Sequence, residues 1–264
     1  MTATATAFDP ARTVAALLGH RRAREVLRAL PPGAAPQTLA QGIEAQVALA
    51  RAVGAMPPAG FKIGATATGM QHYLGLDEPA AGFMAEAGLH GDGSTLSFRD
   101  FVNPGVECEL AVHLGRALPP GPCTPERAAE AVDGVMAAIE IVEKRYWDLR
   151  ELGTPALVAD QVFHAAAVLG APEPGWRALD LPGLPGRMTV DGEIVGEGRG
   201  GDLLGGPMQA LAWLAGSAVA AAFGGLRAGQ VVMLGSVTLP IWLERPCTVE
   251  VCFPPLEPVR LCLG

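Results

Sequence analysis

Two glutamates lie two residues apart in a segment whose other residues favour a buried β-strand. Residues 105–112 read GVECELAV, so Glu107 and Glu109 share one face of the strand while Cys108 and Leu110 take the other. The rise per residue of a strand separates the two glutamate Cα atoms by about 7 Å. Two ionised carboxylates on one buried face repel each other and lose hydration, unless a cation compensates both.

A third carboxylate has a similar apolar setting. Glu140 lies between Ile139 and Ile141, on the strand face opposite to both. Three carboxylates on short strands would form an all-oxygen site, which suits Mg²⁺ or Mn²⁺ better than zinc or copper. The alternative is a solvated face whose glutamates pair with Arg or Lys, and the residue types leave both interpretations open. His113, on the same face as Glu107, fits a structural role better than a role as hard-metal ligand.

Four other polar residues could contribute to a site. Lys62 is an isolated cation in the strand segment FKIGA, where an edge-strand charge is the simpler interpretation and an anion-binding pocket the alternative. Asp160 precedes an apolar segment, which makes a helix N-cap the simpler interpretation there. Ser236 and Thr238 follow a predicted strand, and their hydroxyls could line a pocket or satisfy a turn.

The composition indicates a folded globular protein. The chain has 264 residues, of which 50% are hydrophobic and 17% are charged, enough for a sizeable core. Its net charge of -8 argues against a nucleic-acid surface. Five cysteines without a C-x-x-C pair fit a reducing compartment, the N-terminus lacks signal-peptide features, and the longest apolar run is too short for a membrane span. We therefore expect a cytoplasmic protein.

Helices and strands are expected in different parts of the chain. Residues 1–58 favour helices, with caps at Asp9 and Thr38. Residues 59–264 favour short strands separated by Gly, Pro and Asp. We expect two parts within one structural unit, an N-terminal helical part and a domain with a mixed or antiparallel β core.

Three further local signals fall within residues 59–264. An Asp-Gly pair at 191–192 predicts a β-hairpin. Thr124 and Pro125 predict the start of one helix. A second helix is expected to begin at Pro207 and to continue to Gly224.

The order of several segments resembles one enzyme family. In the order seen in the 2-oxopent-4-enoate hydratase and 4-oxalocrotonate decarboxylase family of the fumarylacetoacetate hydrolase superfamily, the chain carries GFKIG, MQHYLGLDEP, GDGST, VECELA, AAIEIV with a following RY, VADQ, GGPMQALAWLA and LGSVTLP. The resemblance runs from about Gly60 to the C-terminus. It implies an α+β fold with a mixed β-roll or barrel core of the fumarylacetoacetate hydrolase C-terminal type and an N-terminal helical part. It also implies Mg²⁺ or Mn²⁺, a small-molecule 2-oxo acid substrate and a cytoplasmic homo-oligomer, possibly in complex with a decarboxylase or hydratase partner.

The resemblance also implies roles for individual residues. The metal ligands of the family fall on Glu107, Glu109 and Glu140. Its catalytic lysine falls on Lys62, and its Asp-Asn pair falls on Asp160, a second catalytic candidate, and on Gln161. The predicted substrate-binding residues are Leu74 and Gln161 from the resemblance, and Ser236 and Thr238 from their residue types.

Two departures from the family pattern bear on the reaction. Ala80 stands where hydratases usually carry an acidic residue, and Val162 and Phe163 replace small or hydroxyl residues. The decarboxylase branch tolerates an apolar residue at the position of Ala80. We expect a metal-dependent lyase acting on a 2-oxo-enoic acid, of hydratase type, with a 4-oxalocrotonate-type decarboxylase as the alternative. An acylpyruvate C–C hydrolase and a non-catalytic partner subunit are further alternatives.

Overall fold

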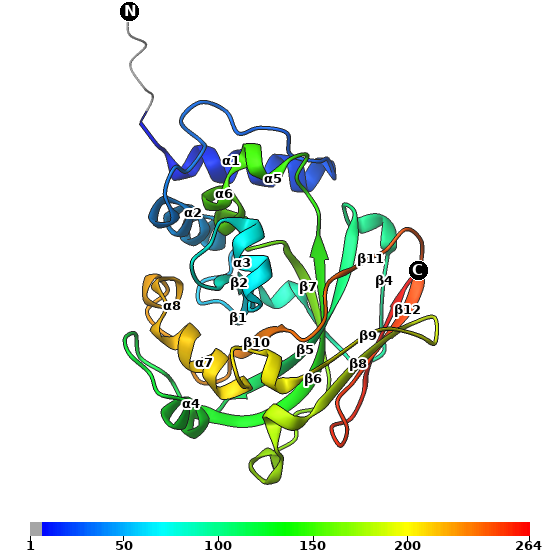
Figure 1. The fold of residues 1–264 in the computed structure, drawn as a ribbon. Helices are drawn as coiled ribbons and strands as arrows, with labels where there is room; N and C mark the ends of the chain where they lie inside the picture. Colours follow the sequence, from blue (N-terminus) through cyan, green and yellow to red (C-terminus); the bar gives the residue numbers. More distant parts are fainter. Residues whose placement is uncertain (1–6) are drawn as a thin grey trace, which may run out of the picture.

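Two helices open the part of the chain that the computed structural model describes, residues 7–264 (Figure 1). α1 (Pro10–Ala23) begins at Asp9, whose Oδ1 accepts a hydrogen bond from the Ala11 N–H at 2.9 Å. α2 (Leu39–Ala52) begins at Thr38, whose hydroxyl accepts a hydrogen bond from the Gln41 N–H at 3.2 Å. Both caps satisfy otherwise unpaired backbone donors and confirm the predicted helix starts.

The larger of two sheets carries the acidic residues discussed above. Its strands are β1 (Gly60–Gly64), β2 (Ala80–Met84), β3 (Leu89–Gly91), β5 (Pro104–Leu114), β6 (Val132–Glu143), β7 (His164–Leu169), β10 (Val231–Ser236) and β11 (Ile241–Trp242). They run in the order β2–β1–β10–β5–β6–β7–β3, and β11 pairs with β5. The long pair β5–β6 is antiparallel, whereas β1–β10 and β3–β7 are parallel. The sheet is therefore mixed, as expected.

The smaller sheet packs against the middle of the larger one. It consists of β4 (Ser94–Leu96), β8 (Pro185–Val190), β9 (Glu193–Arg199), β12 (Cys247–Cys252) and β13 (Val259–Leu263), in the order β4–β13–β12–β8–β9. β8 and β9 form the predicted hairpin. Its turn residues Asp191 and Gly192 have φ of 50° and 86°, the left-handed conformations that a two-residue turn favours.

The remaining helices are short. They are α3 (Thr68–Leu74), α4 (Pro125–Ala131), α5 (Leu149–Leu152), α6 (Thr154–Ala159), α7 (Pro207–Gly216) and α8 (Ala218–Ala222). The ring of Phe223, directly after α8, meets Phe61 of β1 edge-on at 5.4 Å, which fixes this helix against the sheet. No helix within residues 7–264 is long and apolar enough to cross a membrane.

The N-terminal helices are joined to the rest of the chain by buried contacts. The Gln46 side chain of α2 donates to the carbonyl oxygens of Ala81 at 3.0 Å and Val158 at 2.6 Å. Gly42 allows α2 to approach α6, because a Cβ there would lie 2.5 Å from the Pro155 carbonyl oxygen. The division of the chain at residue 58 stays a prediction.

Three local expectations were wrong. Lys62 is not on an edge strand, because β1 lies between β2 and β10. The helix that begins at Pro207 ends at Gly216, and the hydroxyl of Ser217 caps α8 by accepting a hydrogen bond from the Ala220 N–H at 3.1 Å.

Asp160 is also not a helix N-cap. It follows the last residue of α6, and β7 begins four residues later. The strand was missed because it is an alanine-rich run in a buried part of the sheet, so its sequence lacks the alternation of a half-exposed strand.

Candidate active site

The pairing of β5 with β6 brings the three predicted metal ligands together. Glu107 of β5 lies directly opposite Glu140 of β6, and Glu109 lies two residues further along β5. Each carboxylate offers one oxygen to a cluster whose atoms all lie within 4.8 Å of one another. The sheet therefore gathers side chains that are up to 33 residues apart in the sequence, numbers 107 and 140, at one place.

Hydrogen bonds hold one oxygen of each fully buried glutamate. Glu109 Oε2 accepts from the Gly235 N–H at 3.0 Å, and Glu140 Oε1 lies 2.8 Å from His164 Nδ1. The other oxygens, Glu109 Oε1 and Glu140 Oε2, are buried without a protein partner, which is uncommon in residues 7–264 and in folded proteins generally. The pattern fits a bound cation: one oxygen of each carboxylate is fixed by the protein and the other is free.

The pKa values of the three glutamates also indicate a cation site. Burial and the nearby Glu140 raise the pKa of Glu107 to about 8, and burial and the same neighbour raise the pKa of Glu109 well above its usual value. Burial also acts on Glu140, but Lys62 and His164 outweigh it and lower the pKa of Glu140 to about 2. With no cation, Glu140 stays ionised while the other two favour protonation. A divalent cation would displace those protons, because metal ligands must be deprotonated. The donor set therefore fits a hard divalent ion.

Lys62 is the buried cation beside this cluster. Its Nζ lies 3.3 Å from Glu140 Oε1, and its side chain is 2% exposed. The pairing of β1 with β10 and of β10 with β5 places Lys62 on the same side of the sheet as the glutamates. A charged amine at this depth requires such a carboxylate partner.

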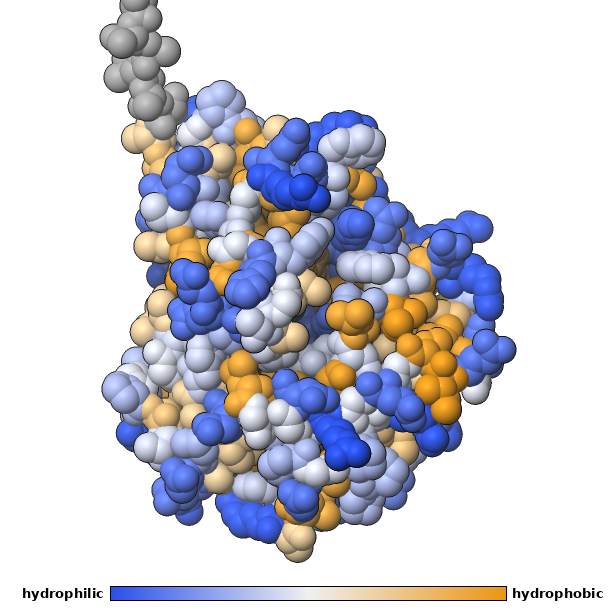
Figure 2. Space-filling view, in the orientation of Figure 1, coloured by the Kyte–Doolittle hydropathy of each residue, from blue (hydrophilic) through white to orange (hydrophobic). Residues whose placement is uncertain are grey.

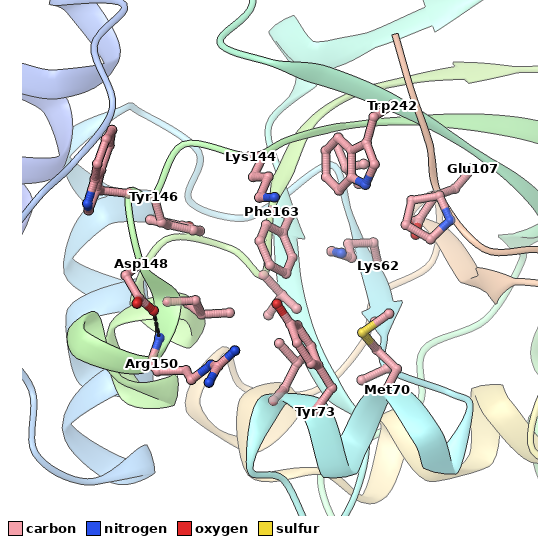
Figure 3. A pocket seen from close by; sticks show the side chains of 18 residues that line it. Lys62, Met70, Tyr73, Glu107, Lys144, Tyr146, Asp148, Arg150, Phe163 and Trp242 are labelled. Carbon is pink, nitrogen blue, oxygen red and sulfur yellow. Dashed lines mark hydrogen bonds between the residues drawn. The ribbon is translucent and has the colours of Figure 1, made fainter.

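A cavity of about 450 Å³ opens beside Lys62 and Glu107. Figure 3 shows Lys62 pointing into it between Glu107 and Met70 of α3, with Trp242 and Phe163 beside it. The wall combines these groups with Leu74, Tyr73, Tyr146, Trp147, Val162, Lys144, Asp148 and Arg150. Tyr73 and Trp147 are 64% and 63% exposed, so they belong to the rim of the cavity. A cavity with an apolar wall and a few convergent polar groups is typical of a small-molecule site.

The face of the molecule that Figure 2 shows gives no stronger candidate. In Figure 2 hydrophilic side chains cover most of the face that is visible, and apolar residues gather mainly at its right-hand side. The cavity with the acidic cluster at its base is thus the candidate active site.

Six predicted site residues do not line this cavity, and two of them are Glu109 and Glu140, which complete the acidic cluster with the cavity residue Glu107. Asp160, Gln161, Ser236 and Thr238 lie outside the part of its wall formed by the described residues. The Ser236 hydroxyl lies 3.3 Å from the Cys108 carbonyl oxygen and accepts from the Thr238 N–H at 3.2 Å, as the turn interpretation expects.

Asp160 belongs to a buried charge network that braces the cavity wall. Its carboxylate accepts from Arg21 of α1, from Arg145 Nε at 3.0 Å and from the Tyr146 hydroxyl at 2.6 Å. Burial alone would raise the pKa of Asp160, but the two arginines outweigh it and lower that pKa. Tyr146 lines the cavity. Asp160 thus holds a cavity residue rather than facing the cavity itself.

The contact of His164 with Glu140 was not predicted from the sequence. The His164 side chain is 3% exposed, and burial lowers the pKa of its imidazole. The sequence feature that could have indicated this contact is a single histidine at the start of the otherwise apolar, alanine-rich segment 164–169. The exposed aromatic residues of the rim, Trp147 and Trp242, carried no signal of periodicity or spacing.

Comparison with known proteins agrees with this architecture. The model of the fumarylacetoacetate (FAA) hydrolase C-terminal family matches residues 65–260. The chain belongs to this family. It is 36% identical to a 2-keto-4-pentenoate hydratase of Burkholderia vietnamiensis over 180 residues, 67% of each chain. It is also 36% identical to a protein of the same name from Paraburkholderia phymatum over 211 residues, 79% of this chain and 78% of the relative.

Decarboxylases are also among the FAA hydrolase relatives. A 4-oxalocrotonate decarboxylase of Pseudomonas sp is 31% identical over 194 residues, 72% of this chain and 73% of the relative. The solved 4-oxalocrotonate decarboxylase from Pseudomonas putida G7, complexed with magnesium and adipate, has a TM-score of 0.87 over 97% of this chain and 99% of that chain, at 22% identity. A fumarylpyruvate hydrolase from Pseudomonas aeruginosa, in complex with Mn²⁺ and pyruvate, covers 77% of this chain and 88% of its own, with a TM-score of 0.61 and 20% identity. The expected family and fold class are confirmed.

Proposed function

We propose that the protein is a divalent-metal-dependent lyase of hydratase type, acting on a 2-hydroxydienoic acid. The observation that carries the proposal is the pair of buried, unpartnered carboxylate oxygens on Glu109 and Glu140, next to Glu107 and Lys62 at the base of a cavity. The hydratase names of relatives that are 36% identical support the type of reaction.

Glu107, Glu109 and Glu140 would hold the ion, with Mg²⁺ or Mn²⁺ favoured by the all-oxygen donor set. When bound, the ion supplies a Lewis acid for the 1-carboxylate and 2-oxygen of the substrate. The carboxylates provide the negative charge that fixes the ion, and the surrounding β-strands keep their spacing rigid.

Lys62 and the apolar wall act on the rest of the substrate. The enol proton leaves the 2-oxygen and a proton is added at C5, which gives a 2-oxo-3-enoate; Lys62 is the proposed carrier of a proton in this step. Water then adds its hydroxyl at C4 and its hydrogen at C3, so the net change is one water. Leu74 and Phe163 line the cavity and would orient the hydrocarbon tail.

A 4-oxalocrotonate-type decarboxylase is the second candidate. Its diacid substrate has a distal carboxylate that leaves as CO₂, and the electron pair passes through the conjugated chain to the 2-oxo group before a proton is added. Two observations favour it: Ala80 provides no acid, and the cations of Lys144 and Arg150 line the cavity without an ion pair among the described residues. These cations could bind a second carboxylate.

The assay that tests the proposal supplies both kinds of substrate with Mg²⁺. Loss of the dienol absorbance of 2-hydroxypenta-2,4-dienoate is the expected result, abolished in Glu107→Gln. Release of CO₂ from a 2-oxo-enedioic acid, without hydration of the dienoate, would replace the proposal by the decarboxylase. Turnover of neither substrate would contradict both and leave the hydrolase and partner-subunit alternatives. A homo-oligomer or a complex with a partner enzyme, and a cytoplasmic location, stay predictions.

A further inference from the structure

We propose that His164 is a positioning residue of the ion site, which holds one oxygen of Glu140 through its Nδ1–H so that only the other oxygen faces the ion. The inference rests on the proposed function for the presence of the ion. His164 is neither a member of the acidic cluster nor part of the cavity wall, so this role is separate from those described above.

The contacts of Glu140 separate its two oxygens. Oε1 lies 2.8 Å from His164 Nδ1 and 3.3 Å from Lys62 Nζ, whereas Oε2 is buried without a partner. Both donors thus act on the same oxygen. Glu140 offers one oxygen to the cluster that Glu107 and Glu109 complete, and the unpartnered Oε2 is the oxygen that remains available to an ion.

The chemistry of the pair fixes the tautomer of the ring. An ionised carboxylate accepts hydrogen bonds and has no proton to give, so His164 Nδ1 is the donor. A neutral ring that donates from Nδ1 carries its lone pair on Nε2. In metal sites, groups that hydrogen-bond to the ligands set the orientation of those ligands and hence the affinity for the metal.

An unusual turn delivers His164 to this position. Gln161, Val162 and Phe163 have φ of 64°, 53° and 68°, three successive left-handed residues of which one is β-branched. Such conformations persist where the surroundings over-determine them, and they cluster at functional sites.

Backbone hydrogen bonds brace each side of this turn. The Val162 N–H donates to the Leu157 carbonyl oxygen at 2.9 Å, and the Phe163 carbonyl oxygen accepts from the Glu143 N–H at 2.9 Å. The turn places Val162 and Phe163 in the cavity wall and His164 against Glu140. The turn at residues 161–163, with its three left-handed residues, therefore positions side chains for both the cavity and the ion site.

The experiment measures Mn²⁺ binding by calorimetry to the metal-free full chain and to three variants. His164→Ala removes the donor, His164→Asn keeps an N–H near the position of Nδ1, and His113→Ala is the control, since His113 lies on β5 outside the cluster. We expect the dissociation constant to rise about 10- to 100-fold in His164→Ala. It should return toward the wild-type value in His164→Asn and stay unchanged in His113→Ala. Circular dichroism confirms that each variant is folded.

A second measurement needs no variant. The ¹⁵N shifts of the His164 ring in the wild-type protein should report a protonated Nδ1 and an unprotonated Nε2. The proposal is overturned if folded His164→Ala binds Mn²⁺ as tightly as wild type, or if the proton is on Nε2. Failure of the wild-type protein to bind Mn²⁺ would refute the proposed function instead, and the ring tautomer would still decide the hydrogen bond.

Discussion

The roles of single residues follow from which of their atoms remain free. Glu109 and Glu140 each have one oxygen fixed by a protein donor and one without a partner. The sequence predicted this cluster because Glu107 and Glu109 must share a strand face and because Glu140 lies in an apolar frame. It could not predict which oxygens are held, since the donors come from Gly235 and His164 on other strands.

Residue-level reasoning did not predict the contacts that depend on distant segments. Asp160 was a catalytic candidate, but its bond to Arg21 joins residues 139 apart in the chain. No local pattern specifies such a pair, because it depends on how α1 packs against the loop after α6. Gln161 is held in a similar way, with its Nε2 donating to the Phe83 carbonyl oxygen at 2.7 Å.

Lys62 offers a direct test at this scale. Lys62→Met keeps the length of the side chain but removes its proton and charge. Turnover of the dienoate should fall roughly 10²- to 10⁴-fold, the usual contribution of a proton-transferring group. Steady-state kinetics measure the loss, and Mn²⁺ binding to the variant shows whether the acidic cluster is intact. Turnover within a few fold of wild type, with Mn²⁺ still bound, would contradict the role of Lys62.

The sequence predicted helix starts and turns correctly where the local backbone conformation requires a particular type of residue. The caps at Asp9 and Thr38 and the hairpin at Asp191 are examples. β7 and the split between α7 and α8 were not predicted, because a buried alanine-rich run has the periodicity of neither element.

Substitution of two glycines tests how backbone conformation contributes to the free energy of unfolding, without steric clashes. A Cβ at Gly19 or at Gly192 would meet no neighbouring atom within 4 Å. Gly192 has φ of 86°, so Gly192→Ala should lower the free energy of unfolding by about 1–2 kcal/mol. Gly19 lies inside α1, so Gly19→Ala should raise it by about 0.5–1 kcal/mol. Urea unfolding measures the change in both variants. Equal changes of the same sign would contradict the left-handed conformation of Gly192 or the helical conformation of Gly19.

Because of the charge network around Asp160, we expect the free energy of unfolding to depend on pH. The folded-state pKa of Asp160 is lowered by its arginines. Its stabilisation is therefore complete above the unfolded-state pKa of about 3.9, and it is lost as the pH falls through the lower, folded-state value. At pH 7, Asp160→Asn should cost about 3–5 kcal/mol of unfolding free energy, because it removes the carboxylate that Arg21 and the buried Arg145 share, and Arg145 then keeps, of residues 7–264, only Glu143 as an ion-pair partner.

Urea unfolding at pH 7, 5 and 3 measures this difference. The gap between wild type and Asp160→Asn should be the same at pH 7 and 5 and should narrow at pH 3. A gap that is constant at all three pH values would show that the charge of Asp160 is not what stabilises the junction of α1 with the sheet.

For the whole molecule, the resemblance to one family predicted the type of β core that composition alone left open. Short strands separated by Gly and Pro indicated a β core, but the order β2–β1–β10–β5–β6–β7–β3 depends on long-range pairing that no single segment encodes. The family resemblance provided the type of core, a mixed β-roll or barrel, without this strand order, and the match to residues 65–260 confirms the family.

We propose that the helical part, residues 1–58, and the catalytic domain, residues 59–264, unfold together. Two buried hydrogen bonds of Gln46 tie α2 to β2 and α6, and a partly buried hydrogen bond of Arg21 ties α1 to the Asp160 network. Scanning calorimetry should show one transition whose calorimetric and van't Hoff enthalpies agree. A separate transition of the size expected for residues 1–58 would contradict this.

The dependence of turnover on the metal is the most direct test of the whole account. The protein is stripped with EDTA, assayed for loss of dienol absorbance, and assayed again as Mg²⁺ or Mn²⁺ is titrated back. We predict that stripping abolishes turnover and that about one ion per chain restores it in wild type. Full turnover by the stripped protein would contradict the claim that Glu107, Glu109 and Glu140 act through a shared divalent ion.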